Sequence, residues 1–263
     1  MPRKAKKKVE KVESVAPALA PMQWLRADYH FHVFHYRMPE TVAIASVTPF
    51  VPSPLTVKMA LVAALLQRGD DRSAQNLARH LPKIEVRIIP PPSAFSFKAF
   101  LRYRSVPAPP EKDKKTGKLK LSGLDESGSY YPSRPHTREY ALFNDALIVF
   151  LGLPDKAILD TVKDALWHIR YLGCKDSLVT CLSVQEVSGD DASAPIASAV
   201  RPLQEGVAGA VILGADFEPS ASVSLRDLIP GARKEEHYCD PPPVFVLPGT
   251  IAVKGRTRIF KRK

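Results

Sequence analysis

The pattern that most constrains the fold is a strand, a helix and a second strand that follow one another between residues 140 and 187. An apolar run at 140–151 predicts the first strand, and the residues from Leu178 onward predict the second. Between them, Pro154 ends the strand and Asp155 offers an N-cap carboxylate to a helix whose apolar residues recur at helical spacing. Gly173 is predicted to end this helix as the residue after the C-cap.

The same order of elements occurs earlier in the chain, with a strand at 25–37, a helix at 54–68 and a strand at 84–89. Together the two units give the order βαββαβ, which predicts an α+β fold of the ferredoxin-like (RRM-like) kind. An unrelated α+β sheet is the alternative. The predicted organisation is a basic disordered extension at 1–21, a ferredoxin-like domain at 22–190 with a long insert at 95–138, and a small β-rich C-terminal region at 191–263 with strands at 210–213, 244–247 and 250–260.

Composition sets the class of protein. A chain of 263 residues that is 45% hydrophobic can bury a real core. No apolar run approaches the roughly 20 residues that span a bilayer, and the basic N-terminus lacks the apolar stretch of a signal peptide, so a cytoplasmic protein is expected. The 3 cysteines form no CxxC pair, which argues against a disulfide framework and a zinc site. No metal and no cofactor is expected.

The net charge of +11 is concentrated in three segments. Residues 1–13 carry six cations and two acidic residues. Residues 98–138 carry ten cations and four acidic residues, and residues 254–263 carry six cations and no acidic residue. The remainder of the chain is therefore mildly acidic. Cations gathered on two tails and one insert are typical of a surface that neutralises phosphates. For the N-terminal run, a disordered solubilising tail is the competing interpretation.

The insert is about forty residues long and rich in proline and glycine. Long loops in compact domains are usually functional or disordered. Residues 118–121 alternate like one arm of a hairpin, and Tyr130 and Tyr131 lie near Arg134 and His136. Aromatic rings mixed with cations are what single-stranded nucleic acid binding requires. A mobile loop without a partner is the alternative.

The C-terminal segment 249–260 alternates apolar and cationic residues at strand period. One face of such a strand can pack while the other offers Lys254, Arg256 and Arg258 to a polyanion. A solvated edge strand protected by its charges is the alternative.

Catalysis of RNA cleavage without a metal would need His, Tyr or Lys side chains around the scissile phosphate. On a strand, His30 and His32 share one face and His35 points to the other, so the three do not converge, and packing against the sheet is expected. His136 in the insert is interpreted as an RNA contact. No catalytic residue is assigned, and the chain is expected to be noncatalytic.

Three segments carry a resemblance to a known family: TPFVPSPLT at 48–56, TREY at 137–140 and YLGCKDS at 171–177. On their order and on the long insert, residues 22–190 resemble the RAMP proteins of CRISPR effector complexes, and among them the CRISPR-associated protein 5 family. The basic N-terminal extension, the lack of a strongly glycine-rich loop and the C-terminal third depart from the family pattern.

The resemblance implies a subunit of a type I (Cascade) surveillance complex that binds guide RNA (crRNA), caps its 5′ handle and serves antiviral defence. The insert would be a thumb-like hairpin against the handle and the adjacent backbone RAMP subunit. The other implied partners are the large subunit and, through the complex, target DNA; no membrane is involved. Prolines make the loop before the helix rigid, and the free amides at the start of the helix favour an anion nearby. Lys58 lies one turn into that helix. A solvated helix-face lysine is its alternative.

Two other functions stay open at this point. One branch of the family cleaves precursor RNA, so a metal-independent endoribonuclease that makes the handle is the first. An RRM-like protein of another ribonucleoprotein is the second, although no aromatic strand of the Gly-Phe-x-Phe kind is present. The predicted RNA-binding residues are Lys58, Arg102, Arg104, Lys114, Lys115, Lys118, Lys120, Tyr130, Tyr131, Arg134, His136, Arg138, Lys254, Arg256 and Arg258.

Overall fold

The computed structural model describes residues 22–36, 47–104, 111–112, 115–117, 119–120, 133–193, 201–202, 209–229 and 234–263. For 102–104, 111–112, 119–120, 133–136, 193 and 201–202 it describes the backbone alone. The predicted extension at 1–21 lies outside the described residues. Among the described helices, none has the length and apolar character needed to cross a membrane.

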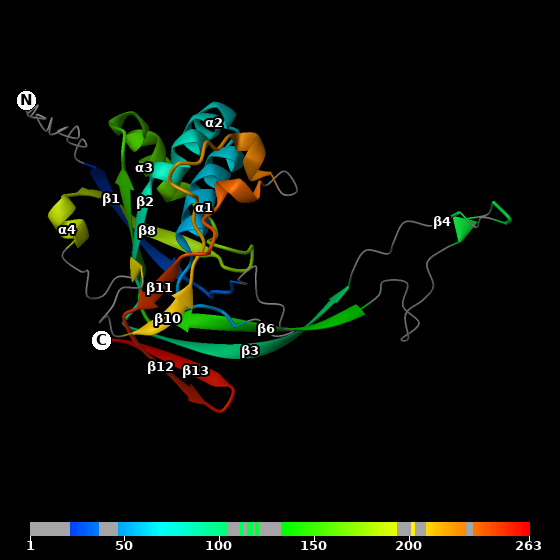
Figure 1. The fold of residues 1–263 in the computed structure, drawn as a ribbon. Helices are drawn as coiled ribbons and strands as arrows, with labels where there is room; N and C mark the ends of the chain where they lie inside the picture. Colours follow the sequence, from blue (N-terminus) through cyan, green and yellow to red (C-terminus); the bar gives the residue numbers. More distant parts are fainter. Residues whose placement is uncertain are drawn as a thin grey trace, which may run out of the picture.

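A mixed α/β body is built on an antiparallel sheet with the strand order β2-β7-β1-β8 (Figure 1). Its strands are β1 (Gln23–Phe31), β2 (Glu85–Ile89), β7 (Leu147–Leu153) and β8 (Val179–Val187). The main helices of the described chain lie between these strands in sequence: α1 (Pro54–Gln67) and α2 (Asp71–His80) before β2, and α3 (Leu159–His168) before β8.

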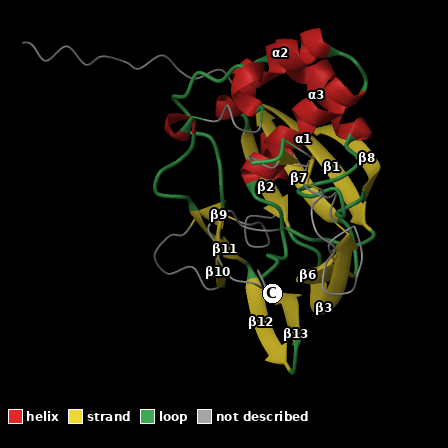
Figure 2. Ribbon diagram, turned by 90° about the vertical axis from the view of Figure 1, so that its right-hand side faces the viewer, coloured by secondary structure: helices red, strands yellow, loops and turns green. Residues whose placement is uncertain are grey.

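The helices cover one face of this sheet (Figure 2). On β1, Leu25, Ala27 and Tyr29 are fully buried against them, in one core cluster with the apolar faces of α1, α2 and α3. On the other face, Trp24 belongs to a small cluster that includes Ala192 of the short helix α4 (Gly189–Ser193). The period-2 pattern of β1 therefore separates a thick core from a thinly covered face.

Helix starts follow the capping residues. The Ser53 side chain accepts from the Thr56 amide at the start of α1, with Pro54 at the first helical position. Asp155 caps a 3₁₀ turn (Lys156–Ile158) that leads into α3, as its N-cap position predicted. The sequence pattern did not reveal α2, which begins after the Asp70 cap. The remaining 3₁₀ turns are Leu81–Lys83, Leu225–Leu228 and Glu235–His237.

Several predicted boundaries are wrong. The run at 140–151 is two strands, because the chain turns at Asn144 and Asp145 and passes from β6 (Ser133–Phe143) in a second sheet to β7 in the first. Gly173 does not end α3, because α3 stops at His168. Gly173 lies instead in the turn before β8, where its φ is +98°. The first strand ends at Phe31, short of the predicted 37.

The second sheet has the order β12-β13-β3-β6. It joins the two ends of the insert, β3 (Ser93–Arg104) and β6, to a C-terminal hairpin, β12 (Gly249–Lys254) and β13 (Thr257–Arg262). β3 and β6 are paired along their whole length and extend away from the body (Figure 1). In the middle of the insert, β4 (Glu111–Lys112) pairs with β5 (Leu119–Lys120), which confirms the hairpin arm predicted there.

The C-terminal residues add further strands. β10 (Ala210–Leu213) and β11 (Val244–Leu247) confirm two predicted strands, and β9 (Arg201–Pro202) pairs with β11. The single strand predicted at 250–260 is wrong, because the chain reverses at Gly255, whose φ is +61°. Phe217, Leu247 and Phe260 pack into the main core cluster. The division of the chain into a 22–190 domain and a 191–263 region stays a prediction.

Candidate nucleic-acid interface

The base of the β3–β6 hairpin is held by the carboxylate of Glu139, which is 2% exposed. Glu139 accepts hydrogen bonds from Arg258 Nε at 2.9 Å and Nη2 at 3.1 Å, from Ser96 Oγ at 2.6 Å and from the Thr48 amide at 2.8 Å. These donors come from β13, from β3 and from the loop before α1. One buried carboxylate therefore joins three separate parts of the chain.

The same bonds set the acidity of this group. Burial acts to raise the pKa of Glu139, but hydrogen bonds from Arg258, Ser96 and Thr48 outweigh it and hold the pKa below its ordinary value. The Arg258 guanidinium is oriented further by the Thr48 carbonyl oxygen, to which it donates, and by the Phe50 ring beneath it, 4.9 Å from centroid to Cζ.

Because the native pKa of Glu139 is lowered, its contribution to stability is present above the ordinary pKa of a glutamate and is lost as the pH falls through the native pKa. We expect the urea midpoint of the wild-type protein to fall between about pH 5 and pH 3, and that of Glu139→Gln to fall less. If the urea midpoints of the two proteins fell equally with pH, Glu139 would not be a carboxylate whose native pKa is lowered.

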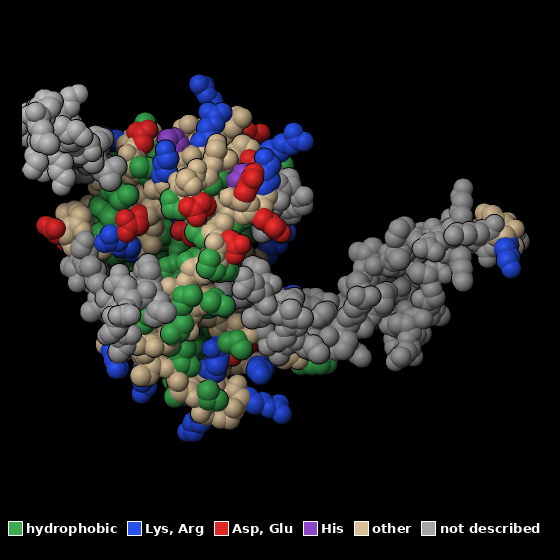
Figure 3. All heavy atoms as spheres, in the orientation of Figure 1, with side chains coloured by type: hydrophobic (Ala, Val, Ile, Leu, Met, Phe, Trp, Pro, Cys, Tyr) green, Lys and Arg blue, Asp and Glu red, His purple; other side chains and the backbone are tan. Residues whose placement is uncertain are grey.

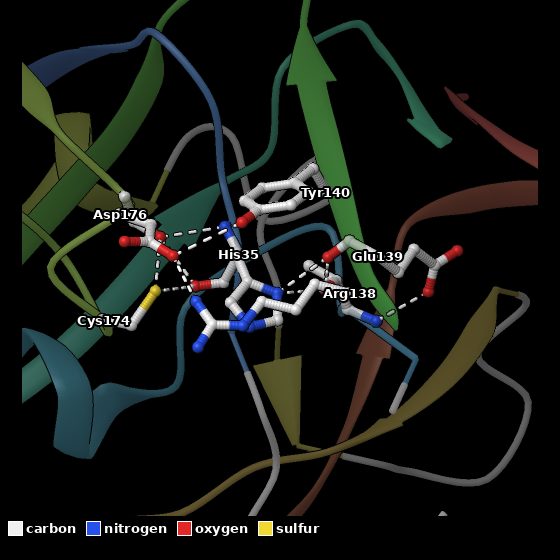
Figure 4. A network of polar contacts seen from close by, with 8 residues as sticks. His35, Arg138, Glu139, Tyr140, Cys174 and Asp176 are labelled. Atoms are coloured by element: carbon white, nitrogen blue, oxygen red, sulfur yellow. Dashed lines mark hydrogen bonds and ion pairs between the residues drawn. The ribbon is translucent and has the colours of Figure 1, made fainter. Parts of the chain in front are cut away.

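His35 connects the backbone of Glu139 to the turn before β8 (Figure 4). Its Nδ1 lies 2.8 Å from the Glu139 carbonyl oxygen, and since a carbonyl only accepts, Nδ1 carries the proton. The His35 amide donates to Ser177 Oγ at 2.9 Å, and its carbonyl oxygen accepts from Ser177 Oγ at 2.6 Å and Cys174 Sγ at 3.0 Å.

A second link runs from β6 to the same turn. Arg138 forms an ion pair with Asp176, and the Tyr140 hydroxyl donates to the same carboxylate at 3.4 Å (Figure 4). The three segments that carry the family resemblance, 48–56, 137–140 and 171–177, are far apart in sequence. In space they meet around His35 and Glu139 at the base of the hairpin.

A hollow of about 560 Å³, here called the β3 hollow, lies at the edge of β3 beside the turn of the β12–β13 hairpin. It exists because β13 pairs with β3 only at Ser93–Phe95, after which Ser96 Oγ, rather than a backbone carbonyl, accepts from the Arg258 amide at 3.2 Å. Beyond that point the edge of β3 is open on this side. The hollow is lined by Phe97, Lys98, Phe100, Thr137, Arg256 and Thr257.

Charge is distributed unevenly over the described surface. In Figure 3, Lys and Arg side chains lie over the helical body and also around β12 and β13, whereas Asp and Glu on this face lie mostly over the helical body, so the surface around β12 and β13 is mainly positive. This agrees with the sequence, in which residues 254–263 carry no acidic residue.

The predicted RNA-binding residues have different positions. Lys115, Lys254 and Arg256 are exposed. Arg138 and Arg258 are part-buried and bound to Asp176 and Glu139, so their charges stabilise the hairpin base. The other insert side chains lie outside the described residues, and their role stays a prediction: Arg102, Arg104, Lys114, Lys118, Lys120, Tyr130, Tyr131, Arg134 and His136.

Lys58 is not the solvated helix-face lysine considered from the sequence. It is 1% exposed, and its Nζ lies 2.6 Å from Asp216 Oδ1. Desolvation lowers the pKa of Lys58 and raises that of Asp216, while their mutual attraction opposes both shifts. A direct contact between Lys58 and RNA would require this pair to separate. No sequence spacing links Lys58 to Asp216, because the contact forms only in the tertiary fold.

The strand histidines also differ from expectation. His30 and His32 are exposed rather than packed, with ring centroids 5.4 Å apart, because they lie on the sheet face that the main helices leave uncovered. Their position on a common face was predicted. Within the described residues, no group of three or more His, Cys, Asp or Glu could hold a metal ion, and the three cysteines are free.

No family model matches the chain. A curated relative, CRISPR-associated protein Cas5 from Archaeoglobus fulgidus, is 24% identical over 217 residues, which are 82% of this chain and 84% of the relative. A crystal structure of a CRISPR protein from Archaeoglobus fulgidus matches at 11% identity with a TM-score of 0.44, covering 92% of each chain. A chain of a CRISPR RNA-guided surveillance complex matches at 16% identity with a TM-score of 0.43, covering 85% of this chain and 88% of that one.

Proposed function

We propose that this chain, which is similar to a curated CRISPR-associated protein Cas5, is a noncatalytic subunit of a Cascade surveillance complex. In this role it binds crRNA, caps the 5′ handle and contacts the adjacent backbone RAMP subunit and the large subunit, in cytoplasmic antiviral defence. Its contact with target DNA is indirect, through the assembled complex.

We interpret the first sheet as a ferredoxin-like βαββαβ core. Two features support this: the antiparallel strand order β2-β7-β1-β8, and helices between β1 and β2 and between β7 and β8. The paired strands β3 and β6 then form an insertion between the second and third core strands, at the place where the family has its thumb.

The observation that carries the proposal is the convergence of the three family segments at the base of this hairpin. Glu139, His35 and Arg138 use their hydrogen bonds to hold β3, β6, β13 and two loops together. A buried polar network of this kind fixes one geometry. This network gives the hairpin a rigid base, and besides the ion-paired Arg138 residues 98–138 carry nine cations, which suit the neutralisation of an RNA backbone.

The test is to incubate the full chain in EDTA with a labelled precursor RNA that contains the repeat, and to follow binding and cleavage in the same sample. The proposal predicts binding that requires the 5′ handle and leaves the RNA intact. Discrete cleavage at the handle boundary would replace it with the endoribonuclease. Binding without any preference for the handle would favour an RRM-like protein of another ribonucleoprotein.

The insert cations should dominate the salt dependence of this binding. We expect replacement of Lys114, Lys115, Lys118 and Lys120 by alanine to weaken RNA binding and to make the slope of log K against log salt shallower by about 0.7 for each phosphate that is no longer neutralised. Fluorescence anisotropy from 50 to 300 mM salt, roughly the range over which counterion release is resolved, measures both quantities.

A charge-matched control removes four exposed cations elsewhere: Arg79, Lys83, Lys156 and Lys234. Both variants lower the net charge equally, so an equal change of slope in the two proteins would mean that the insert has no special part in binding.

A further inference from the structure

The β3 hollow contains two phenylalanine rings that are unusually exposed for this residue type. Phe100 is 71% exposed and Phe97 is 37% exposed, although both lie on the long strand β3. Phe97 stacks on Tyr140, with ring centroids 5.8 Å apart and an angle of 24° between the planes. Phe100 has no ring partner among the described residues. Because the two residues are three apart on β3, their side chains point to opposite faces of the strand, and Phe100 shares its face with Lys98. A large apolar side chain as exposed as that of Phe100, beside a hollow, marks a binding surface rather than a core.

Two cations border these rings. Lys98 and Arg256 line the same hollow, both are exposed, and neither has an ion-pair partner among the described residues. The nearest acidic residue along the strand pairing is Glu139, opposite Lys98, and its carboxylate is turned inward to Arg258. The described lining of the hollow is therefore aromatic and positive, with no acidic side chain.

This combination selects a ligand with flat faces and negative charge. Any of the four bases can stack on an exposed aromatic ring, and a neighbouring phosphate pairs with Lys or Arg. In a duplex both faces of a base are already covered by its neighbours, so a duplex gains nothing from Phe100. An apolar protein surface would leave Lys98 and Arg256 without partners, which disfavours a protein ligand.

We propose that the β3 hollow binds an unpaired nucleotide of single-stranded RNA, with its base stacked on Phe100 and its phosphates paired with Lys98 and Arg256. This inference rests on the proposed function and adds to it a stacking residue, Phe100, that is not among the predicted RNA-binding residues. Thr137 and Thr257 supply hydroxyl groups at the wall of the hollow.

The test uses the full chain and a guide RNA that carries its repeat-derived 5′ handle, either single-stranded or annealed to a complementary strand. Phe100→Ala should bind the single-stranded RNA about tenfold more weakly, the size of one base–aromatic stack, and should bind the annealed RNA as the wild type does. Phe100→Tyr keeps a ring and should keep the affinity. Because the stack is uncharged, Phe100→Ala should leave the salt slope unchanged, whereas Lys98→Ala should make it shallower.

Val253→Ala is the matched control, since Val253 is also 71% exposed and lies on the neighbouring hairpin. Equal affinities of Phe100→Ala and Val253→Ala for the single-stranded RNA, with wild-type binding intact, would overturn this inference alone. Loss of subunit co-purification by Phe100→Ala with unchanged RNA affinity would also overturn it, in favour of protein docking. Failure of the wild-type chain to bind the handle RNA would overturn the proposed function itself.

Discussion

Replacing Arg258 with methionine is expected to destabilise the protein by about 3 kcal/mol, because it leaves the Glu139 carboxylate buried without its charged partner. Arg258 is 19% exposed, which places the effect at the lower end of the range for broken buried pairs. Urea unfolding at neutral pH measures the change.

The control for Arg258→Met is Arg256→Met, which removes an exposed cation two residues away and should change the unfolding free energy by less than about 0.5 kcal/mol. The double variant Arg258→Met with Glu139→Gln should recover part of the loss, because the buried negative charge is gone. Equal stabilities of Arg258→Met and Arg256→Met would show that Arg258 is no more than a solvated edge cation.

The second large effect concerns the buried ion pair between α1 and the segment after β10. Asp216→Ala leaves the ammonium of Lys58, 1% exposed, without a counter-charge, and we expect a loss of about 3 kcal/mol at pH 7. Burial already lowers the pKa of Lys58 in the wild-type protein, and removal of Asp216 lowers it further. With the native pKa below the unfolded one, the variant regains stability as the pH rises towards the unfolded pKa of about 10.4.

Thermal unfolding of Asp216→Ala from pH 7 to pH 10 or so checks this sign, since that range approaches the ordinary lysine pKa. Glu218→Ala, which removes an exposed acid from the same segment, is the control and should show neither the loss nor its recovery. Lys58→Met with Asp216→Ala should be more stable than Asp216→Ala, because an apolar side chain tolerates the buried position. A pH-independent loss in Asp216→Ala would mean that packing, not charge, holds this contact.

Local patterns predicted the elements with strong periodicity and clear caps. The helix at 54–68 and the strands around β1, β2 and β8 were found because their apolar runs have a single period, and the helix that follows β7 was found because Asp155 is an N-cap residue. The apolar run through Asn144 was misread as one strand, because hydrophobicity alone does not show that the chain changes sheets there.

The hairpin base could be located by sequence only in part. The segments at 48–56, 137–140 and 171–177 were singled out, but their meeting at Glu139 depends on contacts such as Thr48 with Glu139 that no spacing encodes. Arg258 was interpreted as a cation for a ligand and is instead the charge partner of Glu139. Phe100 was overlooked, because an alternating strand predicts buried rings and gives no sign that β13 departs after Phe95.

The most direct test of whether the hairpin and its neighbouring cations hold the 5′ handle without cutting it is ultraviolet crosslinking of the full chain to a guide RNA. Both the linked peptides and the linked nucleotides are identified. We expect peptides from 95–138 and 249–263 joined to handle nucleotides, on RNA of unchanged length. Crosslinks confined to the exposed face of the β2-β7-β1-β8 sheet, or to nucleotides outside the handle, would contradict this function.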